Sequence, residues 1–164
     1  MFTIQRVPGD GHCFFHAVIH HLKGKEIIAS VKSKLSVSYL RKLTIKSIKR
    51  LYQNPIEKSF IDFYIEKHDN LDDYLSDLNS SLWAGPLEIY ALSKALRIRI
   101  QVFNYSDLKR IKSLKKNGKR IYKITEQPII DFGDKRRTPV TVVIYGFNFD
   151  ENDSGCHYNA LNSI

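Results

Sequence analysis

One cysteine near the start of the chain lies in a segment whose residue types suit nucleophilic chemistry. Residues 10–17 read Asp-Gly-His-Cys-Phe-Phe-His-Ala, which places Cys13 where a turn gives way to a periodic apolar run. The first amides of a helix have no internal partner and carry partial positive charge. They would favour the nucleophilic thiolate of Cys13 and could hold the oxyanion that forms when it attacks a carbonyl. Gly11 would let the backbone come close to that carbonyl. The alternative is a buried, inert cysteine at a helix start.

A second candidate group lies near the other end of the chain, in the sequence Cys156-His157-Tyr158-Asn159. Alternate residues of a strand share a face, so His157 and Asn159 can point one way while Cys156 and Tyr158 point the other. Asn159 could then accept a hydrogen bond from one imidazole nitrogen and leave the other to face Cys13. A nucleophile, a base and an orienting group are the minimum set for thiol acyl transfer. The alternative is an exposed structural histidine.

The hydrophobic pattern predicts the elements that position these two groups. An extended segment from Thr3 to Val7 ends at a Pro-Gly-Asp-Gly turn, and a helix follows from Cys13 to Leu22. Further helices are expected within residues 31–53, at 56–66, at 71–78 and from Pro86. Strands are expected at 98–103, in a hairpin around Asn117-Gly118, at 140–145 and at 156–161. Because helices come first and strands mostly later, we predict one domain over residues 1–164. Its class is α/β, more narrowly α+β, with a central β-sheet packed between helices.

The composition is that of a globular protein with one hydrophobic core. Apolar residues make up 43% of the 164 residues, aromatic residues 12% and charged residues 26%. No apolar run approaches the roughly 20 residues of a membrane-spanning helix, and the amino terminus does not resemble a signal peptide. Two cysteines are few for a disulfide-stapled secreted domain, which favours a reducing compartment. We therefore expect a cytoplasmic monomer, in the host cytosol if the chain is a viral or bacterial effector.

The net charge of +9 is distributed unevenly. Residues 20–54 hold nine Lys or Arg and one acid, and residues 94–137 hold fourteen Lys or Arg and four acids. Residues 55–80 instead hold seven acids and two lysines. The simplest interpretation is a set of solvated surfaces. The functional one is that the basic faces bind nucleic acid or an anionic membrane, while the acidic stretch meets a basic partner.

Three segments together resemble the ovarian-tumour (OTU) family of deubiquitinases. Residues 10–17 are similar to the nucleophile motif of that family, and residues 83–92, Trp-Ala-Gly-Pro-Leu-Glu-Ile-Tyr-Ala-Leu, are similar to its Trp-Gly-Gly-x-x-Glu segment. His157-Tyr158-Asn159 resembles the histidine strand, and the three segments occur in the family's order. The resemblance implies an OTU fold with papain-like site geometry. It also implies cleavage of isopeptide bonds at the carboxyl terminus of ubiquitin, without a metal or other cofactor.

The same resemblance assigns roles to single residues. Cys13 would be the nucleophile and His157 the general base. Asp10 would shape the oxyanion loop, and Asn159 would be the third member of a Cys-His-Asn triad. The candidate substrate-binding residues are Gly11, His12, Asp72, Asp73, Trp83, Ala84 and Gly85.

Among these, Trp83 would form a wall of a narrow channel for the glycines of the ubiquitin tail, and Ala84 replaces the glycine that the family usually has. Asp72 and Asp73 belong to the acidic stretch, which could attract the arginines of that tail. The implied partners are ubiquitin and polyubiquitin chains, with a ubiquitin-like modifier as a further candidate.

Three other interpretations remain open. The chain could be a catalytically inactive ubiquitin-binding module that keeps the fold alone. A metal could bind the closely spaced residues His12, Cys13, His16, His20 and His21, although these histidines also suit a polar or packing face. A disulfide could join Cys13 to Cys156, but the strand alternation directs Cys156 away from the site.

Overall fold

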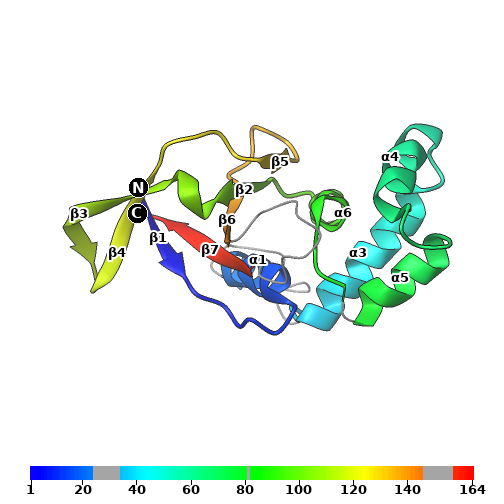
Figure 1. Ribbon diagram of the computed structural model, residues 1–164, viewed down its shortest axis with the longest axis horizontal. Helices are drawn as coiled ribbons and strands as arrows, with labels where there is room; N and C mark the ends of the chain where they lie inside the picture. Colours follow the sequence, from blue (N-terminus) through cyan, green and yellow to red (C-terminus); the bar gives the residue numbers. More distant parts are fainter. Residues whose placement is uncertain (24–33, 81, 146–156) are drawn as a thin grey trace.

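A mixed sheet forms the centre of the computed structural model, which describes residues 1–23, 34–80, 82–145 and 157–164. In these residues the strand order is β3-β4-β1-β7-β6-β2-β5 (Figure 1). Strands β2 and β6 run parallel, and the other neighbours run antiparallel. The strands are β1 Phe2–Gln5, β2 Ile100–Asn104, β3 Leu108–Lys116, β4 Lys119–Ile124, β5 Ile130–Phe132, β6 Val140–Tyr145 and β7 His157–Ser163.

The helices lie between β1 and β2 in the chain, as the sequence predicts. They are α1 Cys13–Lys23, α3 Val37–Leu51, α4 Pro55–Ile65, α5 Leu71–Ser80 and α6 Pro86–Leu96, and a 3-10 turn, η1, covers Tyr105–Asp107. Side chains cap the amino-terminal ends of two helices. Ser36 accepts a hydrogen bond from the backbone N–H of the third residue of α3, and Asn54 accepts one from the backbone N–H of Ile56 in α4. Helices α3, α4 and α5 gather at one end of the molecule, and the β3–β4 hairpin lies at the other (Figure 1).

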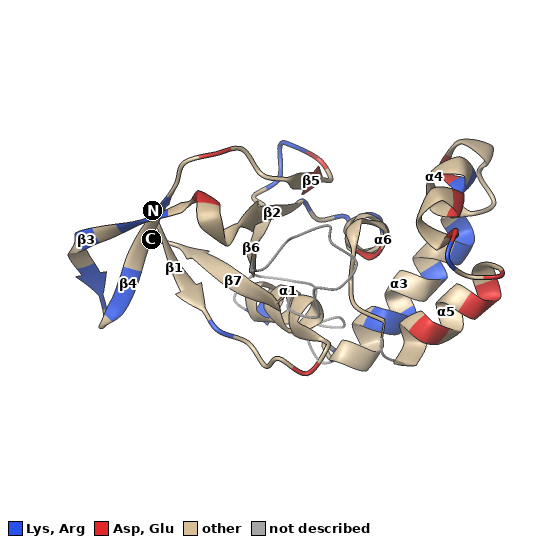
Figure 2. Ribbon diagram, viewed as in Figure 1, with Lys and Arg blue, Asp and Glu red and all other residues tan. Residues whose placement is uncertain are grey.

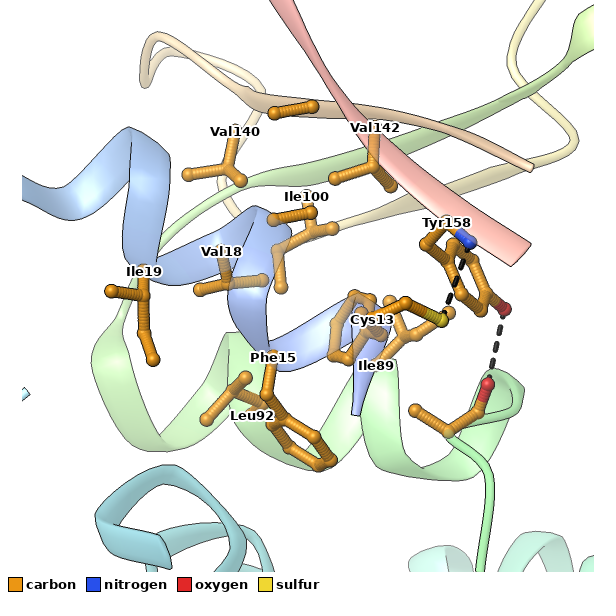
Figure 3. Packing of buried hydrophobic residues seen from close by; sticks show 14 of the residues in the cluster. Cys13, Phe15, Val18, Ile19, Ile89, Leu92, Ile100, Val140, Val142 and Tyr158 are labelled. Carbon is orange, nitrogen blue, oxygen red and sulfur yellow. Dashed lines mark hydrogen bonds between the residues drawn. The ribbon is translucent and has the colours of Figure 1, made fainter. Parts of the chain in front are cut away.

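Two apolar clusters cover opposite faces of the sheet. Val140, Val142 and Ile144 of β6 belong to the cluster that α1 and α6 join, part of which Figure 3 shows. Val143 of the same strand belongs to the other cluster, with residues of β1, β2, β4 and β7 and with Leu108. This alternation follows from the two-residue period of a strand. The predicted α+β class with a central sheet is therefore confirmed.

The predicted elements are found, with shifts at their ends. The predicted strand 156–161 is β7, which starts at His157 in the described residues, because Cys156 lies outside them. Asn117 and Gly118 connect β3 and β4 with φ of 49° and 73°, as the hairpin pattern requires. Strand β5 was not predicted, since three residues after Pro128 are too few to show alternation. In the described parts of the chain, no helix combines the length and apolar character needed to cross a membrane.

Replacing Gly133 by alanine should destabilise the fold. Gly133 has φ +109°, and a Cβ atom there would lie 2.4 Å from the carbonyl oxygen of Ile98 and 2.8 Å from Cα of Arg99. Because both atoms belong to the backbone, we expect the free energy of unfolding to fall by about 3 kcal/mol. Gly118→Ala is the matched control. Gly118 also has a positive φ of +73°, but an added Cβ atom there would have no other atom within 4 Å, so the free energy of unfolding should fall by about 1 kcal/mol. Equal losses in urea denaturation would contradict the contact.

Candidate active site

Cys13 begins α1 and lies against the strand that carries the candidate histidine. Its side chain is 4% exposed, and its Sγ accepts a hydrogen bond of 3.4 Å from the backbone N–H of Tyr158 (Figure 3). The ring of Tyr158 packs edge-to-face on Phe14, with the centroids 5.4 Å apart. The structure therefore places the thiol beside the residue that follows His157 in the chain.

The local environment favours the neutral thiol of Cys13. Burial raises the pKa of this thiol above its ordinary value, and the negative charge of Asp10 adds to the effect. The amides of Tyr158, Phe14 and Cys13 itself lower the pKa, but they do not offset the burial. The expectation that the helix start alone favours the thiolate is thus wrong, because it took no account of desolvation.

His157 and Asn159 occupy the same side of β7, as the alternation predicts. Both line a groove of about 710 Å³ beside β1, whereas Tyr158 packs in the cluster on the other face of the sheet. His157 is half-buried. Gly9 lies beside its imidazole, because a Cβ atom on Gly9 would be 3.6 Å from Nδ1 of His157. The Oδ1 of buried Asn159 accepts a 2.9 Å hydrogen bond from the N–H of Val7. Among the described residues no hydrogen bond joins His157 to Asn159. Through its bond to Val7, Asn159 instead holds the segment that leads to the turn before Cys13.

Asp10 organises the turn in front of Cys13. Its Oδ1 accepts from the N–H of His12 at 3.0 Å, and its Oδ2 accepts from Nε2 of His16 at 2.9 Å. The bond to His16 is the main reason why the pKa of Asp10 lies below its ordinary value. Between these residues Gly11 adopts a φ of +79°. The Asp10 carboxylate therefore ties the turn to the first turn of α1.

A buried arginine that the sequence analysis missed supports the same turn. Arg41 of α3 is 2% exposed, and its Nη2 and Nε donate to Nδ1 of His12 at 2.8 and 3.2 Å. It also donates to the carbonyl oxygens of Gly11, Leu78 and Leu82. A guanidinium can only donate, so Nδ1 of His12 accepts, and a single ring proton belongs on Nε2. Its spacing could have indicated that it is buried, because Arg41 lies three residues before Thr44 and seven before Ile48, on the buried face of α3.

Trp83, Ala84 and Gly85 form another wall near the turn. The hydroxyl of Tyr158 donates to the carbonyl oxygen of Ala84 at 3.0 Å (Figure 3). The N–H of Gly85 donates to Oε2 of Glu88 at 2.7 Å. Trp83 is 43% exposed, and its Nε1 would lie 3.6 Å from a Cβ atom on Gly11. The structure thus brings Gly11, Trp83, Ala84 and Gly85 around the start of α1.

Glu88 is the buried acid that holds this wall. Besides the amide of Gly85, it accepts a hydrogen bond from the hydroxyl of Tyr74 in α5. Burial raises the pKa of Glu88, although the bonds from Tyr74 and Gly85 and the charge of Arg41 lower it. Burial and the nearby carboxylate also raise the pKa of Tyr74. The Glu88–Tyr74 bond therefore connects α5 with the start of α6.

Asp72 and Asp73 are placed differently from the other candidates. Both are exposed in the first turn of α5, whereas Leu78, which contacts Arg41, lies in its last turn. Asp72 pairs with Lys49 of α3 at 3.9 Å, an exposed contact that contributes little. Figure 2 shows acidic residues along α4 and α5. None of the described contacts joins these two aspartates to Cys13 or to its turn.

The four histidines of the alternative metal site each have a different partner. His12 bonds to Arg41, His16 to Asp10, His20 to Oδ1 of Asn162, and His21 to the carbonyl oxygen of Thr141. Within the described ranges, no group of three His, Cys, Asp or Glu side chains converges on a point that a metal ion could occupy. The geometry therefore gives the metal interpretation no support.

Comparison with known proteins places this geometry in context. The family model described as "OTU-like cysteine protease" matches residues 8–131, which include the Cys13 turn and the Trp83–Gly85 wall. The chain is 28% identical over 170 residues to the deubiquitinase OTUD6B of Xenopus laevis. That alignment covers 98% of the chain and 46% of the relative, so the chain spans less than half of its length.

Solved structures with the same fold include two viral domains. The viral OTU domain protease of Qalyub virus matches with a TM-score of 0.61 and 18% identity, covering 99% of this chain and 85% of that one. The Hazara virus OTU bound to ubiquitin matches with a TM-score of 0.57 and 20% identity, covering 99% and 82%. At these identities the likeness establishes the fold.

Removing the Arg41 guanidinium should release the turn before Cys13. In Arg41→Met the carbonyl oxygens of Leu78 and Leu82 and Nδ1 of His12 lose their donor, so we expect the free energy of unfolding to fall by about 3 kcal/mol. The emission of Trp83, the single tryptophan, should also change in the folded state. Lys42→Met, at the exposed next residue, should shift stability by less than about 0.5 kcal/mol. Equal effects of the two variants would contradict the role of Arg41.

The raised pKa of Cys13 predicts slow alkylation at neutral pH. A raised pKa keeps the thiol neutral until the pH passes its folded value. In a Cys156→Ser background the rate with iodoacetamide should therefore rise through a midpoint above the ordinary thiol pKa of about 8.5. The same chain unfolded in guanidinium chloride supplies the ordinary midpoint. A folded midpoint below the unfolded one would show that the site stabilises the thiolate.

Proposed function

The chain belongs to the OTU-like cysteine protease family, and from that premise we propose that it is a deubiquitinase that hydrolyses isopeptide bonds at the carboxyl terminus of ubiquitin. The observation that carries the proposal is the 3.4 Å contact between Sγ of Cys13 and the N–H of Tyr158. It joins the predicted nucleophile to the strand of the predicted base. The name of the Xenopus relative and the ubiquitin bound to the Hazara virus domain support the choice of substrate.

In the proposed reaction His157 must first take the proton of Cys13. Burial favours the neutral thiol, so the imidazole has to accept this proton as Sγ attacks the carbonyl carbon of the terminal glycine. The resulting imidazolium then protonates the leaving lysine amine, and the C–N bond breaks. Water attacks the thioester with His157 as general base, which releases the ubiquitin carboxylate and restores the thiol.

The turn before Cys13 would provide the oxyanion site. Backbone amides at the start of α1 have no partner within the helix and can donate to the tetrahedral oxyanion. Asp10 and Arg41 hold this turn from its two sides, through His16 and His12. Their proposed role is to fix the positions of the amides, since neither side chain would contact the reacting carbonyl.

Asn159 is proposed as the third member of the triad, with a different task from the one expected. Its Oδ1 accepts from Val7, so it braces the segment that passes His157 and leads to Gly9. Restricting the imidazole in this way would limit its motion next to the Cys13 turn without a direct bond. Asn159→Asp, which keeps the acceptor, should retain activity, whereas Asn159→Ala should lower kcat.

A catalytically inactive ubiquitin-binding module is the second candidate. It is motivated by the raised pKa of Cys13 and by the absence of a hydrogen bond between His157 and Asn159 among the described residues. Both candidates keep the fold and ubiquitin as partner, so only a test of the thiol chemistry separates them.

Ubiquitin with a carboxyl-terminal electrophile provides that test. If the chain is an enzyme, wild type should form a covalent adduct, Cys13→Ala should form none, and Cys156→Ser, which keeps one of the two thiols, should react as wild type does. A panel of linkage-defined diubiquitins should likewise be cleaved by wild type and not by Cys13→Ala. Binding of ubiquitin without an adduct or cleavage would establish the inactive module instead.

A further inference from the structure

The groove beside His157 exists because β4 diverges from β1. The two strands pair only at Phe2 with Tyr122 and at Thr3 with Ile121. The following residues of β1 and the start of β4 separate, and the groove of about 710 Å³ opens between them. This volume is within the range of pockets that hold a ligand, roughly 300–1,000 Å³. Its lining includes Gln5, Arg6, Lys119, Arg120, His157 and Asn159.

The charge of this groove is positive. Arg6, Lys119 and Arg120 are exposed and line it, and its described lining includes no carboxylate. Lys119 reaches across the groove, where its Nζ donates to Oε1 of Gln5 at 2.8 Å. A groove with this lining suits an acidic ligand.

The β3–β4 hairpin extends the same positive surface. Residues 108–124 contain eight Lys or Arg and no acid. Figure 2 shows blue segments on both strands of this hairpin. Lys109 faces Lys123, Lys115 faces Arg120 and Lys116 faces Lys119 across the two strands. Like charges directly opposite each other destabilise a hairpin. The arrangement therefore opposes folding of the hairpin and favours binding of anions.

The position of the groove identifies its occupant. Thiol cleavage leaves the acyl part on Cys13, whose side chain lies in the cluster on the helical face of the sheet. The amine leaves with a proton from His157, and His157 lines the groove. The groove therefore lies next to the departing amine, and the chain that carries this amine is the one positioned to enter it.

We propose that the groove between β1 and β4 is a specificity site for acidic residues that flank the scissile lysine of the leaving protein. This inference rests on the proposed deubiquitinase function and adds the chemistry of the substrate on the leaving side. Arg6, Lys119 and Arg120 would pair with the carboxylates of an extended segment.

The test compares two conjugates in which ubiquitin is joined to the lysine of a short peptide. Glu and Asp flank the lysine in one, and Gln and Asn in the other. Wild type should cleave the acidic conjugate about tenfold faster in kcat/KM at low salt, with the preference falling as salt rises. Arg6→Glu and Arg120→Glu should remove the preference. Lys112→Glu is the matched control, because it makes the same charge change on the hairpin outside the groove lining and should keep it.

Two further measurements separate this inference from the proposed function. Ubiquitin carrying a small dye as leaving group should be cleaved equally by wild type and Arg120→Glu, and a loss there would overturn the assignment to the leaving side. The free acidic peptide, labelled with a fluorophore, should bind Cys13→Ala protein and not its Arg6→Glu derivative.

Peptide binding that depends on Arg6 would support the groove even if no ubiquitin conjugate were cleaved. Cleavage of both conjugates at equal rates would overturn the groove while leaving the enzyme in place. Binding of single-stranded RNA or of phosphatidylserine vesicles, without binding of the acidic peptide, would also overturn it in favour of another anion.

Discussion

Arg41 donates its hydrogen bonds to His12, Gly11, Leu78 and Leu82, and the geometry around Cys13 depends on them. A buried guanidinium is unfavourable unless its N–H groups have acceptors. All four acceptors must therefore stay in place for the buried charge to be tolerated. This requirement fixes α3, the end of α5 and the turn before α1 relative to one another. Cζ of the guanidinium also lies over the ring of Phe15, 4.8 Å from its centroid, and Phe15 belongs to the core.

Tyr158 connects this arrangement to the sheet. Its N–H contacts Sγ of Cys13, its ring contacts Phe14, and its hydroxyl contacts the carbonyl oxygen of Ala84. One residue of β7 thus sets the distance between the thiol and the Trp83–Gly85 wall, while its neighbours on the other side of the strand face the basic groove. The two sides of β7 therefore contribute to different parts of the proposed reaction.

Local patterns predicted the elements well and long-range contacts poorly. Turn residues, helix spacing and the Asn117-Gly118 signal depend on neighbours in sequence, and they identified α1, α3 to α6 and the hairpin. Arginine is seldom buried, so no pattern indicated that Arg41 would bind a turn almost thirty residues away. The pKa of Cys13 was predicted in the wrong direction because burial is a property of the assembled core. The groove depends on where the pairing of β1 and β4 ends, which composition does not reveal.

The pairing of the first strand with the last has a consequence for synthesis of the protein. Strand β1 pairs with β7 over Phe2 to Gln5, and Cys13 meets Tyr158 across most of the chain length. Contacts of such high sequence separation form late, because the intervening chain must be ordered or looped first. A ribosome-bound chain carries the thiol early but lacks the histidine strand until residues 157–159 emerge. The contact between Cys13 and β7 can therefore form only when translation of this region is complete.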